Sequence, residues 1–497
     1  MTGMVSQILL AIILGLLAYV YLSWLKTKNF WKKLGVKGPT PLPLVGNYKD
    51  AILGKMHSSL IMQKYYDEYK EEPFVGTFGR NMPMLIMRDP DLIKDVLIKD
   101  FSSFPDRGLI SRESNDPFSQ NLLNLKHNRW RPLRNKLAPV FSSGKLKDMF
   151  YLITDCSKLF EKYVERVAES GEPIECIELT AKYTTDAIGV CAFGLNTNSL
   201  GDEDSGFRKA GRDLMSSGTR NVLRRMLREY VPKLYGFVWP LVYNGALDFF
   251  FDSMKATMEH RKNSKERRND FVDLLMDLRN EKLNDFEMTD SLLISQTLIF
   301  FLAGFETSST TISNALYELA LNEEIQDKLR QEIMNTLERD GQFTYDNIKQ
   351  MKYLDQVVKE TLRKYPPGSF LIRAAATSYT FKGTDVTIPK DTRIMFPVWA
   401  IHNDADIYPD PEKFDPERFT EENQKSRHPM NYLPFGDGPH NCIGLRFASL
   451  QTKIGIATLI KSFRVNPCSE TCIPYRVHPR SFIPAPIGGI VLKFSKV

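Results

Sequence analysis

The spacing of apolar and polar positions predicts a mostly helical chain with a minor β region. Residues 5–25 form an apolar run, VSQILLAIILGLLAYVYLSWL, that contains no charge and is about as long as a helix that crosses a bilayer. Residues 291–321 form a second apolar run without proline, but polar side chains interrupt it near its middle. This second pattern predicts a long helix buried inside a folded domain rather than a second membrane span.

Shorter patterns predict the remaining elements. Residues 74–78 and 84–87 have the composition of short strands on either side of a turn. Residues 89–98 have the pattern of a capped helix, and the spacing from about 145 to 339 is mostly helical. No Gly/Ser-rich linker breaks the chain after residue 40, so we expect one large folded domain.

Composition and charge exclude a few classes of protein. Of the 497 residues, 42% are hydrophobic, which is enough for a sizeable core, and 25% are charged, which is ordinary for a globular protein. The net charge of +6 is small for this length and argues against a dedicated nucleic-acid binder. The six cysteines are scattered and form no C-x-x-C pattern, so neither a disulfide framework nor a zinc site is indicated.

The N-terminal run either spans a membrane or is a cleaved signal peptide. No basic region precedes it and no A-x-A-like site follows it, which favours a retained anchor. Five lysines follow the run between residues 26 and 37, which places the rest of the chain on the cytosolic side. We therefore expect an anchor at 1–27, a basic and proline-rich hinge at 28–47 with an extended strap at 38–46, and a domain at 48–497.

The candidate chemistry centres on Cys442, in the stretch 434–447 with the sequence PFGDGPHNCIGLRF. Glycine and proline residues prevent regular structure before the cysteine, and helical spacing resumes at Leu445. Cys442 is thus predicted at a helix N-terminus, where unpaired N–H groups favour the thiolate that binds metals. The alternative is an ordinary small buried cysteine.

The residues Phe435, Gly438, Cys442 and Gly444 form the pattern F-x-x-G-x-x-x-C-x-G, which resembles the haem-binding loop of the cytochrome P450 superfamily. The resemblance implies the cytochrome P450 fold as a single large domain plus an N-terminal transmembrane helix. It also implies haem b as cofactor, with Cys442 as the axial iron ligand and with Phe435 and Gly444 beside the haem.

The centre of the predicted long helix reads AGFETSS, residues 303–309. The small residues Ala303 and Gly304 are expected to leave room beside the helix, and Thr307 lies one turn from Ala303 on the same face. The Thr307 hydroxyl can bond back to the carbonyl of residue 303 and loosen the helix there. By resemblance, Glu306 and Thr307 are the acid–alcohol pair that relays protons during dioxygen activation, and Ala303 faces the haem.

Four further residues resemble those that hold the haem propionates in the family. Trp130 and Arg134 match a W-x-x-x-R pattern, and an arginine is well suited to bind a carboxylate. Arg373 matches another propionate arginine. His440 stands where the family most often has arginine, and a histidine carries less charge at neutral pH.

Glu360 and Arg363 are three residues apart in KETLRKYPP, which brings opposite charges together on one helix face. Taken alone, this spacing most often indicates a surface ion pair. The resemblance instead implies a buried charged network of Glu360, Arg363 and Arg418 that supports the cysteine loop.

The resemblance implies a monooxygenase that inserts one atom of O2 into small lipophilic substrates. The stretches FFLAGFETSS, ALYELALN and NYLPFGDGP resemble the insect microsomal branch, which acts on xenobiotics, plant allelochemicals and insecticides, although endogenous lipids stay open as substrates. By resemblance, the residues expected to line the pocket are the loop 104–118, which includes Phe104, the helix positions Ile299, Phe300 and Ala303, the segment 369–371, and the turn near Phe482. A haem-thiolate isomerase or dehydratase, or a non-catalytic membrane-tethered haem sensor or carrier, remains an alternative.

The chain contains no G-x-G-x-x-G dinucleotide fingerprint, so electrons are expected from NADPH through a separate reductase, with cytochrome b5 as a further donor. Lys136, Arg446 and Lys453 are expected on the cysteine side, where they suit an acidic reductase surface. The expected location is the endoplasmic reticulum membrane, with the catalytic domain facing the cytosol.

Overall fold

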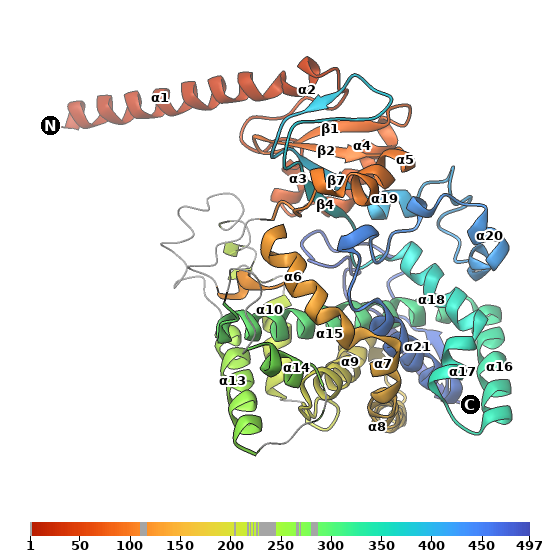
Figure 1. Cartoon of the computed structure of the whole chain (residues 1–497). Coiled ribbons are helices and arrows are strands. Elements are labelled where there is room, and N and C mark those ends of the chain that lie inside the picture. The colour runs from red at the N-terminus through yellow and green to blue at the C-terminus, as the bar shows by residue number, and fades with distance from the viewer. Residues whose placement is uncertain are drawn as a thin grey trace. The chain divides into compact units, whose positions relative to one another are not determined.

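The computed structural model (Figure 1) describes most of the chain. The described residues are 2–109, 117–202, 205–215, 245–264, 270–279 and 287–497, together with 218, 220, 221, 223, 224, 227 and 268. Part of the expected pocket loop, residues 110–116, lies outside the described residues.

The chain forms two compact units. The first consists of Met1–Gly108, Gly368–Pro409 and His428–Asn441. The second consists of Leu109–Pro367, Asp410–Arg427 and Cys442–Val497.

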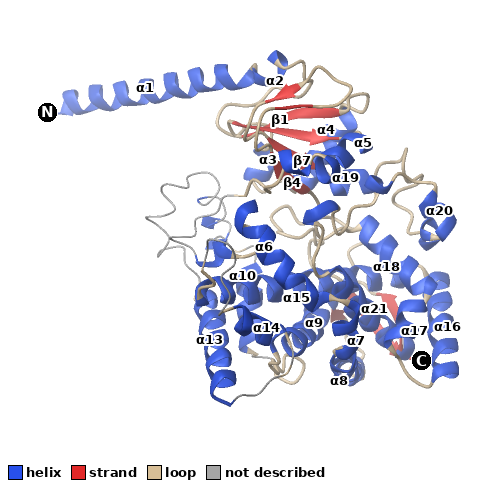
Figure 2. Ribbon diagram, viewed as in Figure 1, coloured by secondary structure: helices blue, strands red, loops and turns tan. Residues whose placement is uncertain are grey.

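The first unit contains a four-stranded sheet in the order β1-β2-β7-β4, with β2 parallel to β7 and the other pairs antiparallel (Figure 2). Its strands are β1 Phe74–Gly79, β2 Met82–Met87, β4 Leu371–Ala374 and β7 Arg393–Phe396, and a separate pair is β5 Tyr379–Thr380 and β6 Thr387–Ile388. Its helices are α1 Thr2–Lys28, α2 Phe30–Lys33, α3 Lys49–Ile52, α4 Ser58–Glu68, α5 Pro90–Lys94 and α19 Val398–His402, with single turns η1 Asp95–Lys99, η2 Phe101–Ser103, η6 Pro429–Asn431 and η7 Gly438–His440. The predicted strands at 74–78 and 84–87 and the capped helix after Asp89 are confirmed.

The segment after the N-terminal helix differs from the predicted extended strap. Leu42 and Gly46 exchange both backbone hydrogen bonds at 3.0 Å and close a tight turn. Leu44 has a φ of 65° and Gly46 a φ of 62°, so the chain reverses where an extended strap was expected. The prediction was wrong because the mutual backbone hydrogen bonds of Leu42 and Gly46 stabilise a turn, and the proline content of the segment does not reveal these bonds. The indole N–H of Trp24 donates to Pro41 O at 2.7 Å and ties α1 to this turn.

The second unit is mostly helical. Its helices are α6 His127–Leu137, α7 Ser143–Asp148, α8 Phe150–Ala168, α9 Cys176–Phe193, α10 Gly206–Met215, α13 Ala246–Ser264, α14 Phe271–Leu278, α15 Asp290–Leu321, α16 Glu323–Asp340, α17 Tyr345–Gln350, α18 Lys352–Lys364, α20 Glu421–Lys425 and α21 Leu445–Ser462. Short turns are η3 Pro117–Gln120, η4 Ala138–Phe141 and η5 Pro416–Phe419, and a small antiparallel sheet has the order β3-β9-β8 with β3 Ile174–Glu175, β8 Phe463–Pro467 and β9 Val491–Lys496.

Helix α15 is the long buried helix that the sequence predicts, and it packs against α9 and α21 (Figure 1). It begins where the Thr289 side chain accepts a hydrogen bond from Leu292 N. Among the described residues, α15 and the N-terminal stretch Met4–Lys33 are long and apolar enough to cross a membrane. Because α15 is mostly buried in its own unit, its apolar surface is already covered by protein.

Helices α9 and α15 approach closely because small and hydroxylated residues face each other. A Cβ on Gly304 would lie 2.9 Å from Ile188 side-chain carbons, so a larger residue at this crossing would force Ile188 to shift. Thr180 Oγ1 lies 2.8 Å from Ser313 Oγ, and Thr184 Oγ1 donates to Phe305 O at 2.9 Å. These bonds satisfy buried polar groups and fix the register of the two helices.

Candidate functional site

Cys442 lies in the second unit, three residues before α21 begins at Leu445. Its side chain is exposed, and Gly444 is the N-cap residue of the helix. The thiol therefore lies beside the N-terminus of α21, a helix of 18 residues. Unpaired N–H groups and the helix dipole favour negative charge at such a position.

Helix α6 places Trp130 and Arg134 one turn apart in the same unit. Trp130 is 2% exposed, and the Arg134 guanidinium carbon lies 5.6 Å from the centroid of its ring. Burial lowers the pKa of Arg134, while the negative charge of Cys442 acts in the opposite direction and raises it. Arg134 and Cys442 are thus close enough for their charges to interact.

The turn before the cysteine is built in the first unit and requires glycine. Gly438 has a φ of 71°, and a Cβ there would lie 2.1 Å from Leu97 O. Asp437 Oδ1 accepts a hydrogen bond from Gly438 N at 2.6 Å, which tightens the turn. Phe435, also in this turn, is partly buried.

His440 ends this turn and is 8% exposed. Its Nε2 lies 2.7 Å from Pro105 O, and its ring centroid lies 5.2 Å from that of Phe101. Because a carbonyl only accepts hydrogen bonds, Nε2 carries the proton in this contact. Nδ1 then donates to a further acceptor only if the ring holds both protons, which makes His440 a weaker carboxylate ligand than an arginine.

Arg373 is a buried cation on β4 of the first unit. It is 3% exposed, and its Nη1 donates to Ile372 O at 2.8 Å. Among the described residues, its Nε has no hydrogen-bond partner, and none of their ion pairs includes Arg373. Burial lowers the pKa of Arg373 to about 10. A buried guanidinium with an unused N–H group fits an anionic partner such as a carboxylate.

The centre of α15 is open on one side. Ala303 is exposed, whereas its neighbours Leu302 and Phe305 are buried. The Thr307 hydroxyl donates to Ala303 O at 2.6 Å, which is the bond to the preceding turn that the spacing allows. Gly304, by contrast, packs against α9 and does not widen this face, so the expectation that it leaves room was wrong.

Glu306 is partly buried and precedes Thr307 on α15. Burial raises the pKa of Glu306, the positive charge of Arg208 opposes this effect, and the negative charge of Glu178 adds to it. A carboxyl group with a raised pKa exchanges protons nearer to neutral pH than an ordinary glutamate, which suits it to proton transfer.

Glu360 and Arg363 form a fully buried pair on α18. Arg363 donates from Nε to Glu360 Oε2 at 2.8 Å and from Nη2 to Glu360 Oε1 at 2.9 Å, and both side chains are 0% exposed. Arg418 Nε lies 3.5 Å from Glu360 Oε1, and Asp415 N donates to the same oxygen at 3.0 Å. The three charged residues therefore meet in one network inside the second unit.

The two arginines and the neighbouring Lys364 also donate hydrogen bonds to three consecutive backbone carbonyls. Arg418 donates to Asp410 O at 2.9 Å and Arg363 to Pro411 O at 2.8 Å, while Lys364 donates to Glu412 O at 2.5 Å. Lys364 also pairs with Glu318, a carboxylate of α15 that is 2% exposed, at 2.9 Å. Sequence reasoning missed Lys364 and Glu318 because nothing in their local spacing indicates that the two residues meet.

Two groups of sequence-based expectations need correction. Lys453 is 6% exposed and pairs with Asp355 at 2.7 Å, so it is not part of an exposed basic face, whereas Lys136 and Arg446 are exposed. Phe300 packs between aromatic rings of the core, with its centroid 4.7 Å from that of Phe271, and does not line an open pocket. Phe104 is 0% exposed and is likewise a core residue.

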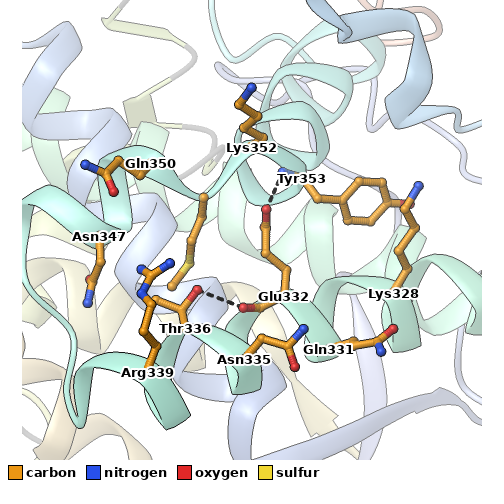
Figure 3. A pocket seen from close by; sticks show the side chains of 11 residues that line it. Lys328, Gln331, Glu332, Asn335, Thr336, Arg339, Asn347, Gln350, Lys352 and Tyr353 are labelled. Atoms are coloured by element: carbon orange, nitrogen blue, oxygen red, sulfur yellow. Dashed lines mark hydrogen bonds between the residues drawn. The ribbon is translucent and has the colours of Figure 1, made fainter.

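The cavity in Figure 3 lies elsewhere, on α16 to α18, and has a volume of about 630 Å³. Most of its side chains are polar. Glu332 accepts hydrogen bonds from Tyr353 N and Leu354 N at 2.9 and 2.8 Å. Glu332 thereby caps the N-terminus of α18, so its role is explained by helix stability.

The sequence profile of the cytochrome P450 family matches residues 36–493, and the chain belongs to this family. Cytochromes P450 hold haem iron through a cysteine thiolate. The match covers both compact units, in agreement with the predicted mostly helical fold with a small β region.

Relatives that align over nearly the full chain come from insects. Probable cytochrome P450 6a13 of Drosophila melanogaster is 40% identical, with 99% of each chain aligned. Cytochrome P450 6k1 of Blattella germanica is 39% identical over 98% of this chain and 97% of its own length. Cytochrome P450 6B1 of Papilio polyxenes is 39% identical over 98% of this chain and 99% of its own. The predicted resemblance to insect cytochromes P450 is confirmed.

Arg363→Ala is expected to leave the Glu360 carboxylate buried without its main partner. This loss destabilises the fold by roughly 3–5 kcal/mol, and we expect protein that retains no haem. Urea unfolding monitored by circular dichroism and haem content per chain measure the two effects.

The control is Lys147→Ala, which removes an ion pair with Asp346 in which both side chains are 61% exposed. Its stability is expected to stay within about 0.5 kcal/mol of the wild type. Equal stability of the two variants would contradict the structural role of Arg363.

Proposed function

We propose that this protein is a haem-thiolate monooxygenase that inserts one oxygen atom of O2 into small lipophilic substrates, with electrons supplied by NADPH through a separate reductase. The observation that carries the proposal is the centre of α15, where the back-bonded Thr307 hydroxyl follows the partly buried Glu306 carboxyl. A haem protein without oxygen chemistry has no need of this pair.

The residues of the chain fit haem b. Cys442 supplies an exposed thiol for the iron, and Trp130 and Arg134 lie in the same unit with Arg134 sensitive to the charge of Cys442. The buried guanidinium of Arg373 suits a propionate, and His440 is a weaker second ligand. When bound, the haem supplies the redox chemistry that activates O2.

The chain's own contribution is to position and move protons. Thr307 Oγ donates to Ala303 O and keeps its lone pairs available for a water molecule on the open face of α15. Glu306, with its raised pKa, takes up a proton from solvent and passes it towards the Thr307 hydroxyl. Ala303 has no side chain beyond Cβ and leaves this face accessible.

The apolar N-terminal helix and the exposed cations support a proposed location and proposed partners. The apolar helix α1 is the proposed membrane anchor, and the lysines after it favour an orientation with the catalytic part on the cytosolic side of the endoplasmic reticulum. Exposed cations such as Lys136 and Arg446 suit an acidic reductase, with cytochrome b5 as a further donor. The substrates that we propose are xenobiotics, plant allelochemicals and insecticides, beside endogenous lipids, in line with the resemblance to the insect microsomal branch.

The test is turnover of a lipophilic probe with NADPH, reductase and isotopically labelled dioxygen. One labelled oxygen atom is expected in each product molecule, and Thr307→Ala is expected to consume NADPH with roughly tenfold less product per NADPH, because proton delivery fails. Product that carries no label, or turnover without NADPH, would contradict the proposal and favour an isomerase or dehydratase.

Arg373→Met is expected to have opposite effects on the haem-free and haem-loaded chains. Without haem, removal of a buried charge that lacks a counter-charge stabilises the fold by roughly 1–3 kcal/mol. With haem, loss of a propionate ligand lowers retention of the cofactor. Thermal unfolding of the haem-free protein and haem content after gel filtration measure these changes.

Arg393→Met on β7 is the matched control, because it removes a partly exposed cation from the same sheet. Its haem content should match the wild type. If Arg373→Met destabilises the haem-free chain and leaves haem retention unchanged, the propionate role is wrong.

A further inference from the structure

Helices α8 and α9 pack against each other in the second unit (Figure 1), and a cavity of about 470 Å³ lies between them and the segment 194–201. Its volume is within the range of small-molecule sites, which is about 300–1,000 Å³. None of the described residues that line it belongs to the proposed haem site. The cavity is therefore a candidate for a second binding site.

One part of the cavity wall is apolar. Leu152, Cys156 and Leu159 line it from α8, and Val190 and Leu200 line it from α9 and the segment after α9. Cys156 and Leu200 are each 6% exposed, whereas Leu159 is 57% exposed. Contact with an apolar ligand removes this exposed leucine surface from water, which is favourable.

One turn of α8 brings two cations to the cavity. Lys162 and Arg166 both line it, and both are exposed. Neither side chain takes part in a hydrogen bond or an ion pair within the described part of the chain. The Arg166 guanidinium carbon lies 5.3 Å from the ring centroid of Tyr163, which lines the cavity as well. Like charges four residues apart repel each other, and an anion bound between them relieves this repulsion.

A third cation, Lys182 of α9, lies against the ring of Tyr163. It is 7% exposed, and its Nζ donates to Tyr163 Oη at 2.9 Å and lies 4.8 Å from the ring centroid. No acidic side chain of the described residues lies within ion-pair distance of it. Water screens the exposed cations Lys162 and Arg166, but a buried ammonium group that is bound to a phenol hydroxyl lacks a counter-charge. Its presence favours an anion close to Tyr163.

Two carboxylates and a further cation line the cavity, and each already has partners. Asp186 accepts hydrogen bonds from two backbone N–H groups at 2.7 and 3.0 Å, and Asp155 pairs with Lys158 at 2.8 Å. Arg268 Nη1 donates to Gly194 O at 2.6 Å. The negative charges of the cavity are thus compensated, which leaves the cations near Tyr163 to attract an anion.

We propose that this cavity binds a single-chain amphipathic carboxylate, such as a fatty acid. Its head group lies on Lys162 and Arg166, and its apolar chain lies along Leu152, Leu159 and Leu200. A guanidinium group matches a carboxylate in geometry, and the apolar lining gives the chain a place that an inorganic anion does not use. The inference does not rest on the proposed function, because the two sites share no residue.

The experiment is photo-crosslinking of the purified full-length protein in phosphatidylcholine nanodiscs with dodecanoate that carries a terminal diazirine. Mass spectrometry locates the label, which is expected on α8 or on residues 190–201. Unlabelled dodecanoate should compete for the site. Dodecanamide has the same chain without the charge, and it should compete about tenfold less well.

Charge-removing variants test the head-group contacts. Lys162→Gln with Arg166→Gln is expected to raise the half-saturating concentration of dodecanoate by about tenfold. Lys182→Met is expected to raise it by about threefold, because this charge acts without direct contact. The double variant decides the test, because both of its positions are exposed and circular dichroism can verify that the protein is folded.

The matched control is Lys147→Gln with Lys328→Gln. It removes two exposed cations of the same unit whose acidic partners lie outside the cavity, so the labelling should stay unchanged.

Label outside the cavity, or equal half-saturation in the wild type and in the Lys162→Gln, Arg166→Gln variant, would overturn the inference. Equal competition by dodecanamide would also overturn it, because apolar contact alone would then explain binding. Stronger competition by soluble dihexanoyl phosphatidylserine than by dodecanoate would assign the cavity to a two-chain lipid and contradict the single-chain class.

Discussion

The close approach of α9 and α15 is the constraint on which the second unit depends. Gly304 admits Ile188 at the crossing, and the hydroxyls of Thr180 and Thr184 reach carbonyl oxygens of Ser309 and Phe305 on α15. This contact covers one face of α15 and fixes its rotation. The face with Ala303 and Thr307 is consequently the one left open, which is why the chemistry that we propose lies there.

Three buried arginines of the second unit each form an ion pair with an acidic side chain. Arg363 is paired with Glu360, Arg208 with Glu178, and Arg261 with Asp270 at 2.6 Å. Arg373 differs from these three, because no acidic side chain of the described residues pairs with it. A buried charge without a partner destabilises a fold, so its presence is best explained by an anionic group that binds there. We propose a haem propionate as this group.

The sequence predicted features that depend on local pattern. The strands around the turn at residue 80, the buried helix up to Leu321, the helix start after Cys442 and the Thr307 bond to residue 303 all follow from spacing within one or two turns. The turn closed by Leu42 and Gly46 was missed because it depends on mutual hydrogen bonds. Arg261, in the basic sequence run 261–269, is nevertheless 5% exposed, because Asp270 and Asp273, nine and twelve residues later, bind its guanidinium. Such tertiary pairings leave no periodic signal.

The central claim is that Cys442 binds haem iron as a thiolate. The most direct measurement is the carbon monoxide difference spectrum of the reduced full-length protein, with the wild type beside Cys442→Ser. A thiolate ligand donates electron density to the iron and shifts the Soret band to longer wavelength. We expect the shifted band in the wild type and its absence in the variant. An unshifted band in folded, haem-containing wild type would contradict it.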